Sequence, residues 1–272
     1  MERIRLDSLL AERGLFESRA RAAASVLAGE VMLLPSRNRA LKPGQMVAPE
    51  VELEVAGRLP YVSRGGIKLA NALDALAIEV EGRSALDVGA STGGFTDCLL
   101  QRGAAHVVAL DVAYGELSWK LRGDPRVTVI ERCNARYIDP AVLPYAPGLI
   151  VVDVSFISLA KVLPAVLGCA APRFDCLAMV KPQFEVGRER IGKGGVVREE
   201  AWRREAIADV ARAGWRLGAG IGGFASSGLP GPKGNRETFV WLTEPARAGL
   251  AAAGSEVELE PVLEAAIAEV GA

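Results

Sequence analysis

The stretch Arg83-Ser-Ala-Leu-Asp-Val-Gly-Ala-Ser-Thr-Gly-Gly-Phe-Thr96 indicates the fold of the larger part of this chain. An apolar run over Ala85–Val88 leads into a turn of small residues, Gly89–Gly94, and a helical pattern follows over Phe95–Gln101. Glycine lets a ligand approach the backbone because it carries no Cβ, and a helix N-terminus offers unpaired N–H groups to an anion. The stretch therefore predicts a strand, a ligand-binding loop and a helix.

A second acidic position supports a nucleotide-like ligand. Asp111 follows the next apolar run, Val107–Leu110, and lies about 20 residues beyond the loop, where nucleotide-binding folds place the acid that binds ribose hydroxyls. The loop lacks the G-x-G-x-x-G spacing, so a dinucleotide is not favoured. The alternative is an ordinary strand-to-helix connection whose glycines serve packing alone.

The composition limits the class of protein. The chain has 272 residues, of which 50% are hydrophobic, and this is enough for one large domain and a small one. No apolar run reaches the roughly 18 residues of a membrane-spanning helix, and Met1–Leu6 lacks the apolar core of a signal peptide. We therefore expect a cytoplasmic protein. A formal net charge of −1 leaves nucleic-acid binding to be judged from the local distribution of charge.

The cysteines and the histidine predict no metal site. None of the cysteines forms a C-x-x-C pair, and the single histidine, His106, opens the second strand pattern. We expect a structural role for His106. In a reducing compartment the cysteines are expected to be small core residues; they are Cys98, Cys133, Cys169 and Cys176.

Residues 1–57 are expected to form a separate small α+β domain. The first leucines of the chain repeat at helical spacing, and Ser18 stands where it caps a second helix. A Lys-Pro-Gly turn at 42–44 separates two runs with strand character. The predicted elements are helices over Arg5–Gly14 and Arg19–Leu27 and strands over Val31–Leu34 and Val51–Val55.

The small domain carries a local excess of positive charge. Between positions 13 and 42, six basic residues accompany only Glu17 and Glu30; a solvated charged face is the alternative to a nucleic-acid surface. The pattern Arg-Leu-Asp…Leu-Ala-Glu-Arg-Gly…Ser-Arg-Ala-Arg-Ala…Ala-Gly-Glu-Val resembles the small RNA-binding module first described in ribosomal protein S-four, whose helix pair and following loop lie on folded RNA. The sequence departs from that module at Leu33–Arg39, where a short Val-Asn-Gly-type hairpin is usual. The resemblance implies RNA contacts by Arg5, Arg13, Arg19, Arg21 and Arg39, and by Arg64 just past the linker.

Residues 58–62 are expected to form a linker, because Pro60 blocks helix continuity, and residues 63–272 to form the catalytic domain. Apolar runs alternate there with helical stretches, which predicts an α/β fold with a mostly parallel sheet covered on both faces. The last two strands have no helix between them and therefore predict an antiparallel hairpin. The expected strands are Ala85–Val88, Val107–Leu110, Val127–Ile130, Leu149–Val152, Cys176–Val180, Leu217–Ala225 and Thr238–Leu242. Helices are expected after Ser63, a candidate cap, and over Val257–Val270.

Charged residues mark one edge of the predicted sheet. In parallel sheets, ligands bind beyond the carboxyl ends of the strands. Asp153 follows the fourth strand, Lys181 follows the fifth, and Glu237 precedes the last strand, which runs in the opposite direction. Lys68 lies in the helix before the first strand. A structural ion pair explains any one of these charges, but all of them at one edge favour a functional site.

Four motifs occur in order along the chain: Asp87-Val-Gly-Ala-Ser-Thr-Gly-Gly-Phe-Thr96, Asp153-Val-Ser-Phe-Ile-Ser158, Val180-Lys-Pro-Gln-Phe-Glu185 and Gly231-Pro-Lys-Gly-Asn-Arg-Glu237. They resemble the motifs of the TlyA family of ribosomal RNA 2′-O-methyltransferases, also called hemolysin A, and the catalytic domain is similar to the wider FtsJ-type group. The resemblance covers nearly the whole chain. It implies a Rossmann-like class I methyltransferase sheet with an antiparallel last strand, S-adenosylmethionine as cofactor, and a cytidine of ribosomal RNA as the target.

The resemblance also assigns site residues. The Lys-Asp-Lys-Glu tetrad of the FtsJ-type group falls on Lys68, Asp153, Lys181 and Glu237. In the family the loop backbone holds the methionine part of the cofactor and the second acid holds its ribose. The cofactor contacts implied in this chain are Asp87, Gly89, Ala90, Ser91, Thr92, Gly93, Gly94, Phe95, Asp111 and Val112.

A ribose 2′-hydroxyl is a poor nucleophile at neutral pH and needs a group that accepts its proton. Burial and a neighbouring cation both favour the neutral form of a lysine. We therefore expect Lys181 to accept the proton and Lys68 to stabilise the developing oxyanion. Asp153 would then orient Lys181, and Glu237 would anchor Lys68 or the ribose. Which lysine is the base stays open, and the reaction needs no metal.

Two other classes of protein remain as alternatives. The hemolysin name suggests a membrane-lytic protein, against which the missing signal peptide and spanning segment weigh. A non-catalytic RNA-binding factor with a vestigial cofactor fold is the other, and the complete tetrad weighs against it. The glycine-rich stretch Gly192–Val196 predicts either a mobile flap over RNA or a plain surface loop.

Overall fold

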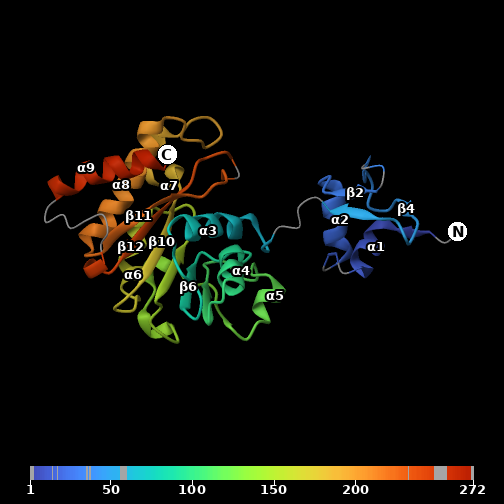
Figure 1. The fold of residues 1–272 in the computed structure, drawn as a ribbon, viewed down its shortest axis with the longest axis horizontal. Coiled ribbons are helices and arrows are strands. Elements are labelled where there is room, and N and C mark those ends of the chain that lie inside the picture. The colour runs from blue at the N-terminus through green and yellow to red at the C-terminus, as the bar shows by residue number, and fades with distance from the viewer. Residues whose placement is uncertain are drawn as a thin grey trace. The chain divides into compact units, whose positions relative to one another are not determined.

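The structure is a computed structural model that describes residues 3–13, 15–16, 18–34, 36, 38–55, 60–231, 233–247 and 256–270. The chain divides into two compact units, Met1–Leu59 and Pro60–Ala272 (Figure 1). Tyr61 and Val62, which the sequence places in the linker, pack against the core of the second unit. The Val62 N–H also donates a hydrogen bond to the Asp97 carboxylate (2.9 Å).

The first unit contains the predicted helix pair, α1 (Leu6–Glu12) and α2 (Arg19–Leu27). The Ser18 hydroxyl accepts a hydrogen bond from the Arg21 N–H (3.3 Å), which confirms the predicted cap. The leucines of α1 are buried in one cluster with the apolar face of α2. The predicted end of the first helix at Gly14 lies outside the described residues.

Short antiparallel strands complete the described part of the first unit. β2 (Val31–Leu33) pairs with β3 (Asn38–Arg39) and with β5 (Leu53–Val55), and β1 (Ile4–Arg5) pairs with β4 (Met46–Val47). The sequence predicts β2 and β5, although β5 begins two residues later than expected. It does not predict the two-residue strands, because they are too short to show an alternating pattern. The pairing of β2 with β3 falls where the sequence departs from the ribosomal module.

A mostly parallel sheet forms the centre of the second unit (Figure 1) and has seven strands within the described residues. The strand order is β11-β12-β10-β9-β6-β7-β8; β12 is antiparallel to both of its neighbours and the other pairs are parallel. This arrangement confirms the predicted sheet and its terminal hairpin. The strands are β6 (Ser84–Val88), β7 (His106–Leu110), β8 (Val127–Ile130), β9 (Leu149–Val152), β10 (Asp175–Val180), β11 (Gly220–Ser226) and β12 (Thr238–Thr243).

Helices cover both faces of this sheet (Figure 1). One face carries α3 (Arg64–Ala75), α4 (Gly94–Gln101) and α5 (Trp119–Arg122), and the other carries α6 (Leu163–Leu167), α8 (Glu200–Arg216) and α9 (Glu256–Glu269). The short helix α7 (Pro182–Glu185) follows β10, and 3-10 turns span Ala135–Tyr137, Pro140–Val142, Leu159–Lys161, Arg188–Arg190 and Pro245–Arg247. The terminal helix α9 packs on the sheet as predicted, because its buried face contacts β11 and α8.

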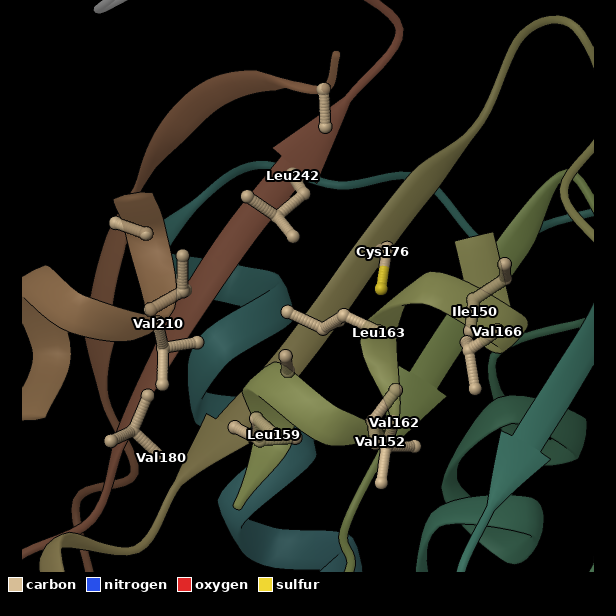
Figure 2. Packing of buried hydrophobic residues seen from close by; sticks show 14 of the residues in the cluster. Ile150, Val152, Leu159, Val162, Leu163, Val166, Cys176, Val180, Val210 and Leu242 are labelled. Atoms are coloured by element: carbon tan, nitrogen blue, oxygen red, sulfur yellow. The ribbon is translucent and has the colours of Figure 1, made fainter. Parts of the chain in front are cut away.

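Alternation along the strands divides the core into two layers. Ile150 and Val152 of β9 meet Leu163 and Val166 of α6 (Figure 2), while the strand residues between them face the other layer. Burying each such side chain contributes roughly 1.5–3 kcal/mol. The continuous apolar runs of the sequence reflect this burial on both faces.

Two predictions about element ends need correction. Leu217, predicted as the first residue of a strand, is the C-terminal cap of α8, and Gly218 turns the chain with a φ of 86°. Glycine in this left-handed region commonly ends a helix, so β11 begins only at Gly220. Ser63 precedes α3 as expected, but its side chain makes no capping hydrogen bond within the described residues.

A buried carboxylate holds the amino ends of the parallel strands together. Asp175, at the start of β10, is 3% exposed. Its oxygens accept hydrogen bonds from Arg83 (2.6 Å), Trp241 (2.8 Å) and Arg247 (2.7 Å). Two cations and an indole therefore compensate one buried charge, and they join the residues before β6, within β12 and after β12.

We predict that Asp175→Ala lowers the free energy of unfolding by about 1.5–3 kcal/mol, because it removes the hydrogen bonds that two half-buried guanidinium groups and an indole make to this carboxylate. Denaturant unfolding followed by circular dichroism measures this loss. Asp74→Ala is the control, since Asp74 forms an exposed pair with Arg102 and such pairs contribute about 0–1 kcal/mol. Equal stability of the Asp175 and Asp74 variants would contradict the assignment.

Candidate functional site

The predicted cofactor loop is built from residues that tolerate left-handed backbone. It follows β6, and Gly89, Ser91 and Gly93 have φ values of 87°, 48° and 95°. A Cβ at Gly89 would lie 2.5 Å from the Asp153 carbonyl oxygen, and one at Gly93 would collide with the side chain of Leu121. Glycine is therefore required for both the conformation and the close packing of this loop.

The same restriction applies where the loop becomes helix α4. A Cβ at Gly94 would collide with the Ser63 hydroxyl and lie 2.9 Å from the Gly66 nitrogen. The absence of a side chain at Gly94 therefore lets α4 pack closely against α3, the helix that carries Lys68. Phe95 of α4, a predicted cofactor contact, is buried and packs on Phe239 of β12 with ring centroids 5.9 Å apart. Its side chain therefore supports the loop from the core.

Asp87, just before the loop, is a buried acid with an unused oxygen. It is 0% exposed, and its Oδ2 accepts a hydrogen bond from the Thr96 hydroxyl (2.6 Å). Its Oδ1 has no hydrogen-bond partner among the described residues. Burial raises the pKa of Asp87 to about 7. An orphaned acceptor beside a ligand loop fits a ligand that brings a hydrogen-bond donor.

Asp111 lies against the loop, as the sequence predicts. Its Oδ2 accepts a hydrogen bond from the Ser91 N–H (2.7 Å), and its Oδ1 accepts one from the Ala113 N–H (2.7 Å). Each carboxylate oxygen has a second lone pair for a ligand hydroxyl. The neighbouring Val112 is 68% exposed, so its contact with a cofactor stays a prediction.

A small pocket adjoins Asp111, and the sequence analysis missed two of its acids, Glu116 and Glu131. Ser91, Asp111, Leu117 and Glu131 are among the residues that line it. Glu131 accepts a hydrogen bond from the Gly115 N–H (2.8 Å) and so shapes the loop after β7. It follows β8 as Asp111 follows β7, and this shared position was the signal that could have found it.

The predicted tetrad forms two ion pairs. Lys68 Nζ pairs with Glu237 Oε2, and Lys181 Nζ pairs with Asp153 Oδ1 at 2.5 Å. Lys68 and Glu237 are buried, with exposed fractions of 7% and 3%. The Lys181–Asp153 pair is more exposed to solvent. Burial of the first pair requires each charge to compensate the other. The catalytic roles of these residues stay predictions.

Strand register brings the two ion pairs to one edge of the sheet. Val180 of β10 is the Cα partner of Thr238 of β12, so Lys181 and Glu237 stand next to this paired position at the same end. The Asp153 N–H donates to the Val88 carbonyl (2.8 Å), directly before the glycine loop. The structure therefore gathers the loop and the predicted catalytic groups at the carboxyl ends of the parallel strands.

Ser155 is a further partner of Lys181 that the sequence analysis missed. Lys181 Nζ donates a hydrogen bond to the Ser155 hydroxyl at 2.9 Å. The two residues are 26 positions apart, and a hydroxyl two residues after a strand-end acid carries no signal of its own. Lys181 is thus held by two residues of the loop that follows β9.

The predicted RNA-binding arginines are all exposed, but three of them have partners within the first unit, among them Arg19, whose guanidinium lies 3.8 Å from Asp7 Oδ1. Arg5 pairs with Asp7 at 2.7 Å, and Arg13 donates to the Val51 carbonyl at 2.8 Å. The latter contact ties α1 to the chain before β5. The remaining members of the predicted set lie on the surface and are Arg21, Arg39 and, in the second unit, Arg64.

The histidine and the cysteines have the structural roles that the sequence predicts. His106 Nε2 lies 2.8 Å from the Thr128 hydroxyl, and its ring packs edge-on against Tyr145. The cysteines are free thiols, buried except for the half-buried Cys133. Within the described residues, no group of three or more acids, cysteines or histidines could hold a metal ion. No helix of the described chain is long and apolar enough to span a membrane.

A glycine loop after the first strand of the sheet, an acid after the second and an antiparallel last strand together define a class I methyltransferase. Residues 61–244 match the family model of FtsJ-like methyltransferases. The chain is 48% identical over 271 residues to the 16S/23S rRNA (cytidine-2′-O)-methyltransferase TlyA of Mycobacterium tuberculosis, and the match covers 98% of both chains. The protein belongs to the FtsJ-like methyltransferases and, among them, to the TlyA family.

Two further relatives agree with this family. The rRNA methyltransferase candidate YqxC of Bacillus subtilis is 42% identical over 261 residues, covering 95% of this chain and 91% of YqxC. The solved structure of a hemolysin candidate from Streptococcus thermophilus matches with a TM-score of 0.72 and 37% identity, over 100% of this chain and 96% of the other. Both matches extend through the small N-terminal unit.

We predict that Asp87 makes the stability of the ligand-free protein depend on pH. Its folded pKa of about 7 lies above the ordinary value of 3.8, so the folded chain binds the extra proton between these values and stability falls as pH rises through this window. Asp87→Asn removes that dependence. Unfolding measured from pH 4 to 8 should show a flatter profile for Asp87→Asn, whereas the surface variant Glu264→Gln keeps the wild-type slope. Identical profiles for Asp87→Asn and wild type would contradict the raised pKa.

Proposed function

We propose that this protein transfers a methyl group from S-adenosylmethionine to the ribose 2′-hydroxyl of a cytidine in ribosomal RNA. The observation that carries the proposal is the meeting of the Lys68–Glu237 and Lys181–Asp153 ion pairs at the edge that carries the glycine loop. The proposal also draws on the printed name of the Mycobacterium tuberculosis relative. The predicted cytoplasmic location suits a ribosomal substrate.

The residues around the loop fit S-adenosylmethionine. The cofactor, when bound, supplies an electrophilic methyl group on a sulfonium centre. The unused Oδ1 of Asp87 accepts a donor such as an ammonium group, and Asp111 beside the small pocket accepts ribose hydroxyls. The backbone of Gly89–Gly94 would lie beside the bound cofactor, in the conformation that its glycines allow.

The two lysines have different roles in activating the ribose 2′-hydroxyl. Lys68 is enclosed with Glu237, and its ammonium group stabilises the developing oxyanion. Lys181 is reached more easily and accepts the proton of the 2′-hydroxyl. Asp153 and Ser155 hold Lys181 Nζ at 2.5 and 2.9 Å, and this fixes the direction from which it meets the hydroxyl.

We predict that Lys181→Ala lowers kcat by about 100-fold or more, because general-base catalysis contributes roughly 10²–10⁴-fold. Transfer of a labelled methyl group into purified ribosomal subunits measures kcat, and calorimetry measures cofactor binding, which should remain. The control is Lys161→Ala, an exposed lysine of the 3-10 turn Leu159–Lys161. Normal transfer by Lys181→Ala with cofactor bound would contradict the base assignment.

Further assays separate the proposed function from its alternatives. Mapping of ribose methylation in RNA from cells with and without the protein identifies the modified nucleotide. Binding to subunits without methyl transfer by the wild type would instead support a non-catalytic RNA-binding factor. Leakage of dye from lipid vesicles at low protein concentration would support the membrane-lytic class.

We predict that the double substitution Arg19→Ala and Arg21→Ala weakens binding of ribosomal RNA and leaves kcat at saturating RNA unchanged. Each lost phosphate contact should reduce the slope of log affinity against log salt by about 1. Filter binding over a range of salt concentrations measures both effects. Arg204→Ala is the control, because Arg204 pairs with Glu200 on α8. An unchanged salt slope for the double variant would contradict RNA contact by α2.

A further inference from the structure

The loop that follows β9 presents two partners to Lys181. Asp153 and Ser155 both bind Lys181 Nζ, at 2.5 and 2.9 Å. Between Asp153 and the buried Leu159 the chain makes neither helix nor strand. The position of the proposed base therefore depends on a loop that regular backbone pairing does not hold.

This loop contains a strained residue. Phe156 has a φ of 65°, in the left-handed region, and its side chain is 91% exposed. A non-glycine residue in that region costs roughly 1–2 kcal/mol, and it persists only where surrounding contacts fix the backbone. Burial of the Phe156 side chain does not provide such contacts, so they must come from elsewhere in the loop.

Glu185 supplies them. Its Oε2 accepts a hydrogen bond from the Ser158 hydroxyl (2.6 Å), and its Oε1 accepts one from the Leu159 N–H (2.9 Å). Ser158 in turn accepts from the Ala160 N–H (3.2 Å), which starts the following 3-10 turn. Both oxygens of one carboxylate are thus used to fix the last two residues of the loop.

Residues 181–185 therefore contact both ends of the loop that follows β9. Lys181 binds its beginning, and Glu185, four residues later, binds its end. Between them the rings of Phe184 and Phe156 lie 5.2 Å apart. Burial raises the pKa of Glu185, with a smaller contribution from Asp209 on α8. Glu185 is half-buried, and the two hydrogen bonds that its carboxylate accepts offset the cost of this partial burial.

We infer that Glu185 is a positioning residue for Lys181: by fixing Ser158 and Leu159 it keeps the strained loop in the shape that presents Asp153 and Ser155 to the lysine. The inference rests on the proposed methyl transfer, in which Lys181 accepts the proton. Glu185 itself touches neither Lys181 nor the reacting atoms. Its loss acts through the loop, and cofactor binding at Gly89–Gly94 and RNA binding at α2 are left as they are.

The test compares Glu185→Ala with Glu185→Gln in the full-length chain. Glu185→Ala should lower kcat by about 10- to 100-fold, because small misplacement of a catalytic group has effects of this size. Its KM for RNA and its Kd for S-adenosylmethionine should stay within about threefold of the wild type. Glu185→Gln should retain most of kcat, because the amide oxygen still accepts from Leu159 and the Ser158 hydroxyl can rotate to accept from the amide. Glu264→Ala, an exposed acid on α9, is the control and should resemble the wild type.

Hydrogen exchange provides a readout that does not depend on activity. Amide exchange of residues 154–160 should be faster in Glu185→Ala and unchanged in Glu185→Gln and Glu264→Ala. If Glu185→Ala does not fold, Ser158→Ala removes one of the two contacts and should show the same changes to a smaller degree. Unchanged kcat in the Ala variant, or a loss of kcat equal in the Ala and Gln variants, would overturn the inference. A wild type that transfers no methyl group would refute the proposed function, while the exchange data would still test the loop.

Discussion

A lysine that is buried on folding needs a compensating opposite charge, and this requirement constrains how the second unit of the chain packs. Lys68 and Glu237 are both buried and are 169 positions apart in the sequence. Leaving either charge buried without the other would cost several kcal/mol. Helix α3 can therefore pack in its place only when the last strand returns beside β10. The ion pair links α3, the first helix of the second unit, to the residue that precedes β12, its last strand. The other site residues lie between Lys68 and Glu237 in the sequence.

The two ion pairs of the site differ in how far solvent reaches them, and this difference gives them different uses. The Lys68–Glu237 pair is enclosed, so its charges are fixed. In the Lys181–Asp153 pair, Asp153 begins a loop whose backbone is strained at Phe156 and hydrogen-bonded to Glu185. Strain of this kind is common where a protein fixes the geometry of a reacting group. The enclosed pair thus suits the proposed stabilisation of the oxyanion, and the more open pair suits the proposed transfer of a proton.

Local chemistry explains which parts of the site the sequence predicts. Gly89 and Gly93 are required because their φ values are positive and side chains would collide there, so the glycine loop is visible in a short stretch of sequence. Asp111 follows an apolar run, and parallel strands place such residues on one edge. Ser155 and Glu185 were missed because their contacts are with residues far away in the chain. A serine or glutamate outside an apolar run has many solvent-exposed uses, and nothing local distinguishes these.

The sequence by itself determined the order of strands and helices, the sheet with its antiparallel end, the ligand edge and the family. Periodic apolar runs and backbone-restricted glycines are local properties, and they were sufficient for this. The start of β11 was misjudged because Leu217 continues an apolar run although it caps α8. Only the tertiary structure decided that the four charges form Lys68–Glu237 and Lys181–Asp153 rather than other pairs. Pairing of charges depends on register and burial, which are fixed when distant segments pack together and are not encoded in any short stretch of residues.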